Sequence, residues 1–388
     1  GFLGSAQSFR EEYIVPIEAN KVAGAIAYEK LSQTLRHVLI RRTRDAAMKS
    51  VLPPCITMRV QCAFTPRQAV AYLQESEAVL RHGGGGDILP AIMRLRGVCC
   101  DASADRSDAA DGADARGVSP LAWHEMTSTK LYFVSRLLES IFDKPGSVMS
   151  SVAGSDGDAG TDRVVIVSNF IAALDAVQAL IRERNWLHFR IDGSTAVELR
   201  QSIVHKFNAP RSPFKVVLLS TKAGGVGLNL VGANRLVMLD PDWNPSTDHQ
   251  AMGRVWRDGQ TKPVFIYRIA CVGSVEESIL ARQRAKGDLL SLVEKACEDG
   301  TATRPESRSE EEKSECRGKG KKGMAKAAGT GSDLSKLHGE GLEQLVRPGG
   351  AALSPLEAFR IVTEVTSTAD SPVDPVLDGL RLKGRVVA

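Results

Sequence analysis

The stretch that decides the fold is Val216–Leu230, which reads VVLLSTKAGGVGLNL. Its first four residues are apolar and predict a short buried β-strand. The loop that follows holds Gly224, Gly225 and Gly227, and glycines let backbone N–H groups approach an anion closely. Ligands of parallel α/β sheets gather at the carboxyl ends of the strands, so this loop predicts a binding site at that edge.

A second stretch, Gln250–Gln260, reads QAMGRVWRDGQ. On a helix, spacings of four and then three residues place Gln250, Arg254 and Arg257 on one face. One amide and two guanidinium groups on that face predict a clamp for phosphate. Together with the glycine-rich loop, this stretch indicates a protein driven by nucleotide or nucleic acid.

The segments around these two stretches alternate between strand and helix patterns. Short apolar runs bounded by polar residues predict further strands at 164–167, 188–191, 236–239 and 264–267. Helical apolar stripes separate the first of these strands, at 170–181 and at 199–207. The alternation predicts an α/β fold with a parallel sheet covered by helices on both faces.

The chain divides into three predicted regions. Residues 1–95 have mostly helical spacing and are expected to be connecting structure. Residues 96–296 form the α/β domain, with disordered inserts at 101–119 and 146–161, whose few apolar residues cannot offset their ordering entropy. Residues 297–388 predict a low-complexity, largely disordered tail, with short helices near 334–345 and 356–365.

The bulk composition narrows the class of protein. A chain of 388 residues with 43% hydrophobic content can fill the core of a globular domain. Residues 163–290 hold 17 Lys and Arg against 11 Asp and Glu, which is compatible with a polyanionic partner. The seven cysteines include no Cys-x-x-Cys, so no disulfide framework and no metal site are expected. With no apolar run of 18 residues and Gly1 at its start, the chain is expected to stay out of membranes and to be part of a longer protein.

These strings resemble the second motor lobe of the Swi/Snf-type DNA translocases in helicase superfamily two. The resemblance is closest to the recombinational-repair branch, the Rad-fifty-four group, whose pattern this chain follows through Thr221–Gln260. Further matching strings are Gly1–Ser5, Leu39–Thr43, Leu52–Pro54, Thr129–Leu131, Val167–Phe170, Ile191–Thr195 and Phe207–Asn208. The resemblance implies a RecA-like second helicase lobe at 96–296, preceded by the end of the first lobe and a helical region between the lobes.

The resemblance also implies roles for individual residues. Arg254 and Arg257 would be catalytic, because the family uses them to stabilise charge on the γ-phosphoryl group of ATP. Contacts with the nucleotide are implied for Gln250, Gly225, Gly227 and Asp258. Contacts with one strand of double-stranded DNA are implied for Ser168, Asn169, Gly193, Thr195, Arg200, Ser220, Thr221, Lys222, Asn229 and Trp243. Such contacts meet phosphates rather than bases, so binding is expected to be salt-sensitive and independent of sequence.

Two elements of the family pattern are missing from this sequence. It contains no Gly-x-x-x-x-Gly-Lys-Ser/Thr loop and no Asp-Glu-x-His box. In the family, these elements hold the phosphates and the Mg²⁺ ion and belong to the first lobe. We therefore expect that this chain hydrolyses ATP only when it is joined to a first lobe, and that it is inactive alone.

Three functions are consistent with the sequence. The leading hypothesis is the carboxyl-terminal motor lobe of a nuclear DNA translocase in homologous-recombination repair or chromatin remodelling, with a recombinase filament or a nucleosome as a further partner. The alternative is a non-catalytic lobe for DNA binding or protein interaction, from a fragment or a degenerate paralogue. An RNA helicase of the same superfamily is a third possibility, which the string Asp240–Pro245 argues against.

Overall fold

The computed structural model describes residues 3–19, 21–35, 52–81, 88–101, 127–143, 162–223, 227–284, 346, 359–366, 374 and 385–387. The described residues fall into two compact units, one drawn from 1–49 and 281–327 and one from 50–280 and 328–388. The predicted helix at 334–345, the predicted insert at 146–161 and almost all of the insert at 101–119 lie outside the described residues.

The first unit is helical. It contains α1 (Ala6–Phe9), the π-helical turn η1 (Arg10–Ile14), α2 (Val15–Ala19) and α3 (Lys21–Leu35). The π-helical turn is followed by Pro16, which lacks the N–H group that a regular helical bond would need at that point. A Cβ atom on Gly24 would come within 3.1 Å of the Cα atom of Ile17, so glycine allows α2 and α3 to pack closely. The helical character predicted for this segment is confirmed.

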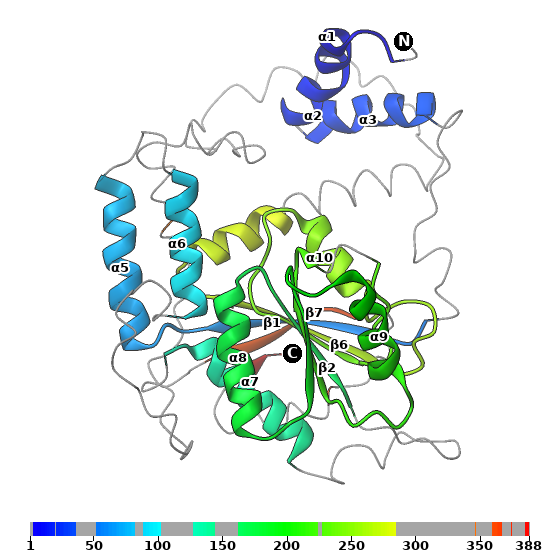
Figure 1. Cartoon of the computed structure of the whole chain (residues 1–388). Helices are drawn as coiled ribbons and strands as arrows, with labels where there is room; N and C mark the ends of the chain where they lie inside the picture. The colour runs from blue at the N-terminus through cyan, green and yellow to red at the C-terminus, as the bar shows by residue number, and fades with distance from the viewer. Residues whose placement is uncertain are drawn as a thin grey trace. The chain divides into compact units, whose positions relative to one another are not determined.

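The second unit is built on an eight-stranded sheet with the strand order β3-β4-β2-β5-β6-β1-β7-β8 (Figure 1). Its strands are β1 (Cys55–Cys62), β2 (Val164–Ser168), β3 (His188–Ile191), β4 (Val216–Ser220), β5 (Arg235–Met238), β6 (Val264–Cys271), β7 (Phe359–Thr366) and β8 (Arg385–Val387). The first six strands in this order run parallel, and β7 pairs antiparallel with β1. The five strands that the apolar runs predict are confirmed as β2 to β6.

Helices cover both faces of this sheet, as predicted. One face packs against α5 (Pro66–Arg81), α6 (Ile88–Cys100), α7 (Thr129–Phe142) and α8 (Ile171–Glu183), and the other against α9 (Val197–Asn208) and α10 (Pro245–Met252) (Figure 1). Each face of the sheet has its own hydrophobic core, and the side chains of β2 alternate between the two. Val164 and Ile166 pack in the first core, and Val165 and Val167 pack in the second. None of the helices in the described ranges combines the length and the apolar content that crossing a bilayer requires.

The structure corrects two of the predicted regions. Residues 55–62 were expected to belong to helical connecting structure over 1–95, yet they form β1, which lies between β6 and β7. Residues 356–365 were expected to be helical within a disordered tail, yet 359–366 form β7, with Phe359 and Ile361 about 1% exposed. In both segments, pairing with a strand that is distant in the sequence outweighs the local pattern.

Buried polar contacts also attach the carboxyl-terminal residues to the second unit. The guanidinium group of Arg235, 1% exposed, donates to Asp162 at 2.7 Å and to Asp374 at 2.8 Å. The hydroxyl of Tyr72 donates to the carbonyl oxygen of Val346 at 2.7 Å. These residues therefore complete the core of the α/β unit, and the tail predicted from residue 297 onward is in part structured.

Candidate functional site

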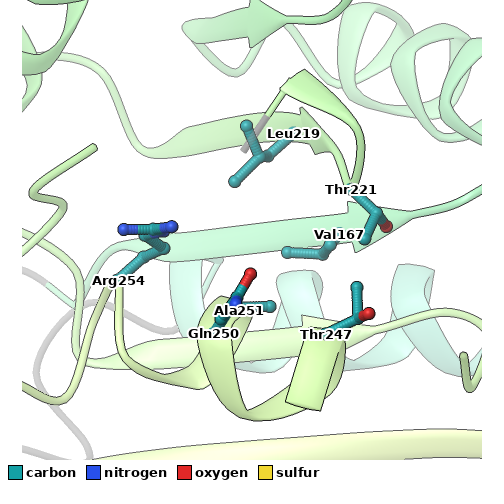
Figure 2. Close-up of a pocket in the computed structure, with 7 residues that line it drawn as sticks. All are labelled: Val167, Leu219, Thr221, Thr247, Gln250, Ala251 and Arg254. Carbon is teal, nitrogen blue, oxygen red and sulfur yellow. The ribbon is translucent and has the colours of Figure 1, made fainter. Parts of the chain in front are cut away.

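A small pocket opens at the carboxyl ends of β2 and β4, beside α10. Its walls are formed by Val167, Leu219, Thr221, Thr247, Gln250, Ala251 and Arg254. Figure 2 shows the side chains of Gln250 and Arg254 on the same side of the pocket as α10, facing Val167 and Leu219, each of which lies one residue before the end of its strand. This is the edge of a parallel sheet at which ligands are expected, and Thr221, Gln250 and Arg254 are residues that the sequence singles out.

The polar side chains of this pocket are not used in contacts with the described residues. The hydroxyls of Thr221 and Thr247, the amide of Gln250 and the guanidinium of Arg254 have no hydrogen-bond or ion-pair partner in the described part of the chain. Partly buried polar groups are normally satisfied, and groups left open at a pocket are available to a ligand. The pocket therefore has the chemistry of a binding site rather than of a packed core.

The predicted single helical face for Gln250, Arg254 and Arg257 is wrong in its geometry. Helix α10 starts at Pro245 after the N-cap Asn244, whose side chain accepts from the backbone N–H of Ser246. The helix ends at Met252, with Gly253 as its C-cap. Arg254 and Arg257 follow in consecutive turns. Of the two, Arg254 lines the pocket and Arg257 does not.

The turns after α10 are held in place by side-chain and backbone bonds. The buried amide of Gln260 donates to the carbonyl oxygens of Val231, Ala233 and Val255 and accepts from the backbone N–H groups of the next two residues. The carbonyl oxygen of Arg254 accepts from the backbone N–H of Leu230 at 2.9 Å. The arginine backbone is thus tied to the segment that follows the glycine-rich loop.

Arg254 and Arg257 form a positive region at this edge of the sheet. Neither makes an ion pair within the described residues. Partial burial, and then the charge of Arg257, lower the pKa of Arg254 below its ordinary value. Both effects disfavour the charged guanidinium, and an anion in the pocket would relieve both. The arrangement therefore favours an anionic ligand.

A phosphate group fits the chemistry of this pocket. Its polar lining consists of one guanidinium, one amide and two hydroxyls, all of which can donate to phosphoryl oxygen, and none of the lining residues is acidic. A magnesium ion prefers carboxylate oxygen and would have to be held elsewhere. Among the other nucleotide contacts implied by resemblance, Gly227 is exposed with φ +33°, Asp258 is exposed outside the pocket lining, and Gly225 lies outside the described residues.

Several of the residues implied to contact DNA are accessible at the same edge of the sheet. Gly193 and Lys222 are exposed, while Asn169, Thr195 and Asn229 are partly exposed. They lie on loops that follow β2, β3 and β4. The contacts of these five residues with DNA remain predictions, and their exposure is compatible with them.

Three other implied DNA contacts are corrected by the structure. The Ser168 hydroxyl is fully buried and donates to Asp240 at 2.5 Å, and the buried Ser220 hydroxyl accepts from the backbone N–H of Ala223. Arg200 is 9% exposed and donates to the carbonyl oxygens of Thr195 and Asp192. These side chains support the loops and are not available to phosphates.

Trp243 is partly buried in the structure. Its ring packs against the core, and its indole N–H is buried with no hydrogen-bond partner among the described residues. The implied contact of Trp243 with DNA stays a prediction.

Two residues of the site are missed by the sequence reasoning. Thr247 lines the pocket one turn before Gln250 and Ala251, and the helical spacing of three and four residues could have revealed it. Asp240 is 3% exposed and accepts from Ser168 and from both N–H groups of Asn169. The sequence does show that Asp240 directly follows one buried strand and that Ser168 and Asn169 lie at the end of another. These positions could have indicated the contact.

Comparisons with known families and proteins show which family this chain belongs to. The family model of the helicase conserved C-terminal domain matches residues 153–259, and that of the SNF2-related domain matches residues 1–104. The human DNA repair and recombination protein RAD54-like is 36% identical over 314 residues, which cover 76% of this chain and 40% of that protein. DNA repair protein rhp54 of Schizosaccharomyces pombe is 35% identical over 314 residues, or 77% of this chain and 36% of that protein.

Two solved structures are also similar to this chain. The C-terminal part of the Fun30 ATPase domain has a TM-score of 0.47 and 24% identity, covering 59% of this chain and 89% of that chain. The Sulfolobus solfataricus SWI2/SNF2 ATPase core in complex with dsDNA has a TM-score of 0.43 and 27% identity, covering 72% and 54%. The present chain spans about 40% of the length of the curated relatives given above.

Proposed function

Because this chain belongs to the SNF2-related family and carries its helicase C-terminal domain, we propose that it is the second motor lobe of an ATP-dependent translocase on double-stranded DNA. The proposal depends on the pocket at the ends of β2 and β4, where Arg254, Gln250 and two threonine hydroxyls have no partner among the described residues. A first lobe, which holds ATP and Mg²⁺, would face this pocket during hydrolysis.

Each arginine has a defined part in this proposal. Arg254 reaches the γ-phosphoryl group from the pocket, and Arg257 adds positive charge beside it. A guanidinium suits this role because it donates two parallel hydrogen bonds to phosphate and stays protonated. Gln250 orients the transferred group or the attacking water between the two lobes.

The accessible loops at the strand ends supply the contacts with DNA. Gly193, Thr195 and Lys222 would meet the phosphates of one strand, so that binding follows the backbone and not the base sequence. The curated relatives carry names of DNA repair and recombination proteins. By this analogy, the translocase would act in the nucleus in homologous recombination or chromatin remodelling, on a recombinase filament or a nucleosome.

ATP turnover of the chain joined to a first lobe with a phosphate-binding loop tests this function. We expect duplex DNA to stimulate hydrolysis by the joined protein, and we expect no hydrolysis by the chain alone. Arg254→Ala should lower kcat by roughly a thousandfold or more, the range of arginine fingers elsewhere, and leave duplex binding intact. Arg182→Ala, at an exposed arginine of α8, is the control. Normal turnover by Arg254→Ala would refute the contact of this arginine with the γ-phosphoryl group.

The same experiment separates the alternative functions. A non-catalytic interaction lobe would bind duplex DNA but show no turnover after joining, whichever arginine is present. An RNA helicase would be stimulated by RNA in place of duplex DNA. Comparing the two nucleic acids as activators therefore decides among the three functions.

A further inference from the structure

A buried carboxylate lies behind the pocket and connects its two walls. The side chain of Asp240 accepts from the Ser168 hydroxyl at 2.5 Å, from the backbone N–H of Asn169 at 3.1 Å and from the Asn169 amide at 2.6 Å. Ser168 ends β2, and Asp240 follows the end of the neighbouring strand β5. One carboxylate therefore fixes the ends of two adjacent strands relative to each other.

Both residues of the Ser168–Asp240 hydrogen bond are linked to a wall of the pocket. On one side, the carbonyl oxygen of Ser168 accepts from the backbone N–H of Thr221 at 3.0 Å, and Thr221 lines the pocket. On the other side, the chain runs from Asp240 through Asp242, whose backbone N–H donates to Asp248 of α10. Helix α10 carries Thr247 and Gln250, which form the opposite wall.

Two buried cations hold the turn at Asp240 from the far side. Arg96 of α6, 2% exposed, donates to the carbonyl oxygen of Pro241 at 2.8 Å and lies 3.6 Å from the Asp240 carboxylate. Lys130 of α7, 1% exposed, donates to the carbonyl oxygen of Leu239 at 2.7 Å and pairs with Glu276 at 2.6 Å. Buried ion pairs with this many hydrogen bonds define one geometry, because any other would leave charges unpaired.

We propose that Asp240 is a positioning residue that holds the Thr221 wall and the α10 wall of the pocket at the separation needed for hydrolysis. This inference rests on the proposed function, since it assigns the pocket to the transferred phosphoryl group. A displacement of the order of 1 Å in such a site can cost about a hundredfold in rate. Asp240 would therefore act on kcat without touching the nucleotide.

The chain offers a matched control at the opposite edge of the sheet. Asp162 is also buried, pairs with Arg235 at 2.7 Å and accepts from the Asn234 amide at 2.8 Å. It lies at the amino end of β2, a full strand away from the pocket. Asp240→Asn and Asp162→Asn each remove one buried charge and keep the side-chain shape. We therefore expect a similar loss of stability from both, whereas only Asp240 lies beside the pocket.

The first test compares the two variants in the joined protein. We expect Asp240→Asn to lower kcat for ATP by about tenfold to a hundredfold with KM within twofold, and Asp162→Asn to leave kcat within twofold. Equal effects of the two variants on kcat, or a normal kcat for Asp240→Asn, would overturn the inference. If Asp240→Asn does not fold, Ser168→Ala, which removes one bond from the same carboxylate, replaces it with the same expectation.

The second test uses the chain alone and does not depend on ATP turnover. Trp243 lies three residues after Asp240, so its fluorescence emission reports the position of this turn. We expect Asp240→Asn to shift the emission to longer wavelength and Asp162→Asn to leave it unchanged, each compared with the same variant carrying Trp243→Phe. An unchanged emission for Asp240→Asn would refute the positioning role. A joined wild-type protein without turnover would instead refute the proposed function, while the emission still decides the role of Asp240.

Discussion

At the scale of single residues, the pocket differs from the rest of the α/β unit in how its polar groups are used. Asp240, Arg235 and Gln260 are buried and each makes several hydrogen bonds. Thr247 and Arg254, in contrast, have no partner in the described ranges. Polar groups that line a pocket and have no partner among the described residues are available to a ligand.

The hydroxyl of Thr247 gives a prediction at this scale. Thr247→Val keeps the shape of the side chain and removes a hydrogen bond of about 0.5–1.5 kcal/mol, so KM for ATP should rise roughly twofold to tenfold in the joined protein. Thr247→Ser should restore the wild-type value. Ser246→Ala changes a neighbour that does not line the pocket and serves as the control. Equal KM values for the valine and serine variants would contradict a contact with nucleotide.

Asp192 gives a second prediction, which concerns the loop after β3. The hydroxyl of Ser194, then the guanidinium of Arg190 and the Ser194 backbone N–H, lower the pKa of Asp192 to about 2 from an ordinary value of 3.8. A lowered pKa stabilises the folded state above the ordinary value, and this contribution disappears as the pH falls from about 4 to about 2.

The size of this effect follows from the same shift. We expect Asp192→Asn to lower the free energy of unfolding by about 1–2 kcal/mol at pH 7 and to approach the wild-type value near pH 2. Urea unfolding at several pH values between 7 and 2 measures the difference. Glu183→Gln, at an exposed carboxylate of α8, should show no such convergence. A constant difference at every pH would show that the charge of Asp192 is not responsible.

At the scale of secondary-structure elements, the sequence predicts those whose pattern is local. Val164–Val167 and Val216–Leu219 are continuous apolar runs, and the structure confirms them as β2 and β4. Strand β7 was predicted as a helix, because the apolar spacing of Phe359–Thr366 is also compatible with a helix. Its partner β1 lies far away in the sequence, so the local pattern does not reveal the pairing. Helix α10 was predicted too long, since the spacing of Gln250, Arg254 and Arg257 does not reveal that Gly253 ends the helix.

The buried contacts of β7 lead to a prediction about the carboxyl-terminal segment. Phe359 is 1% exposed and meets the ring of Phe133 edge-on, with ring centroids 5.1 Å apart. Phe359→Ala should therefore lower the free energy of unfolding by about 3–5 kcal/mol, as expected for a large side chain removed from a core. Leu187→Ala, at a residue 51% exposed, should cost less than about 0.5 kcal/mol. If both variants unfold at the same urea concentration, β7 does not belong to the sheet in solution.

At the scale of the whole molecule, the α/β unit brings the ends of β2 and β4 and helix α10 together at one edge of its sheet, and it buries its thiols. The sequence could place Arg254 and Gln250 near the glycine-rich loop, because both follow parallel strands whose carboxyl ends meet. It could not identify Asp240 as the connection between the walls, since that role depends on Arg96 and Lys130 from distant helices.

The buried thiols give a prediction for the whole unit. Cys55, Cys62, Cys99, Cys100 and Cys271 are free and buried. Burial raises the pKa values of Cys62, Cys99 and Cys100, so the reactive thiolate is scarce at pH 8. Alkylation followed by peptide mass mapping should modify these five residues only after unfolding in urea. Rapid labelling of Cys99 in the native protein would contradict the packing of α6 against the sheet.

The most direct test of the motor function is kcat for ATP, at saturating duplex DNA, of the joined protein with Arg254→Ala beside the Arg182→Ala control. If the pocket holds the transferred phosphoryl group, Arg254→Ala should lose roughly a thousandfold or more in kcat, while Arg182→Ala and duplex binding stay at the wild-type level. A kcat for Arg254→Ala within twofold of the wild type would contradict the assignment of this pocket to ATP hydrolysis.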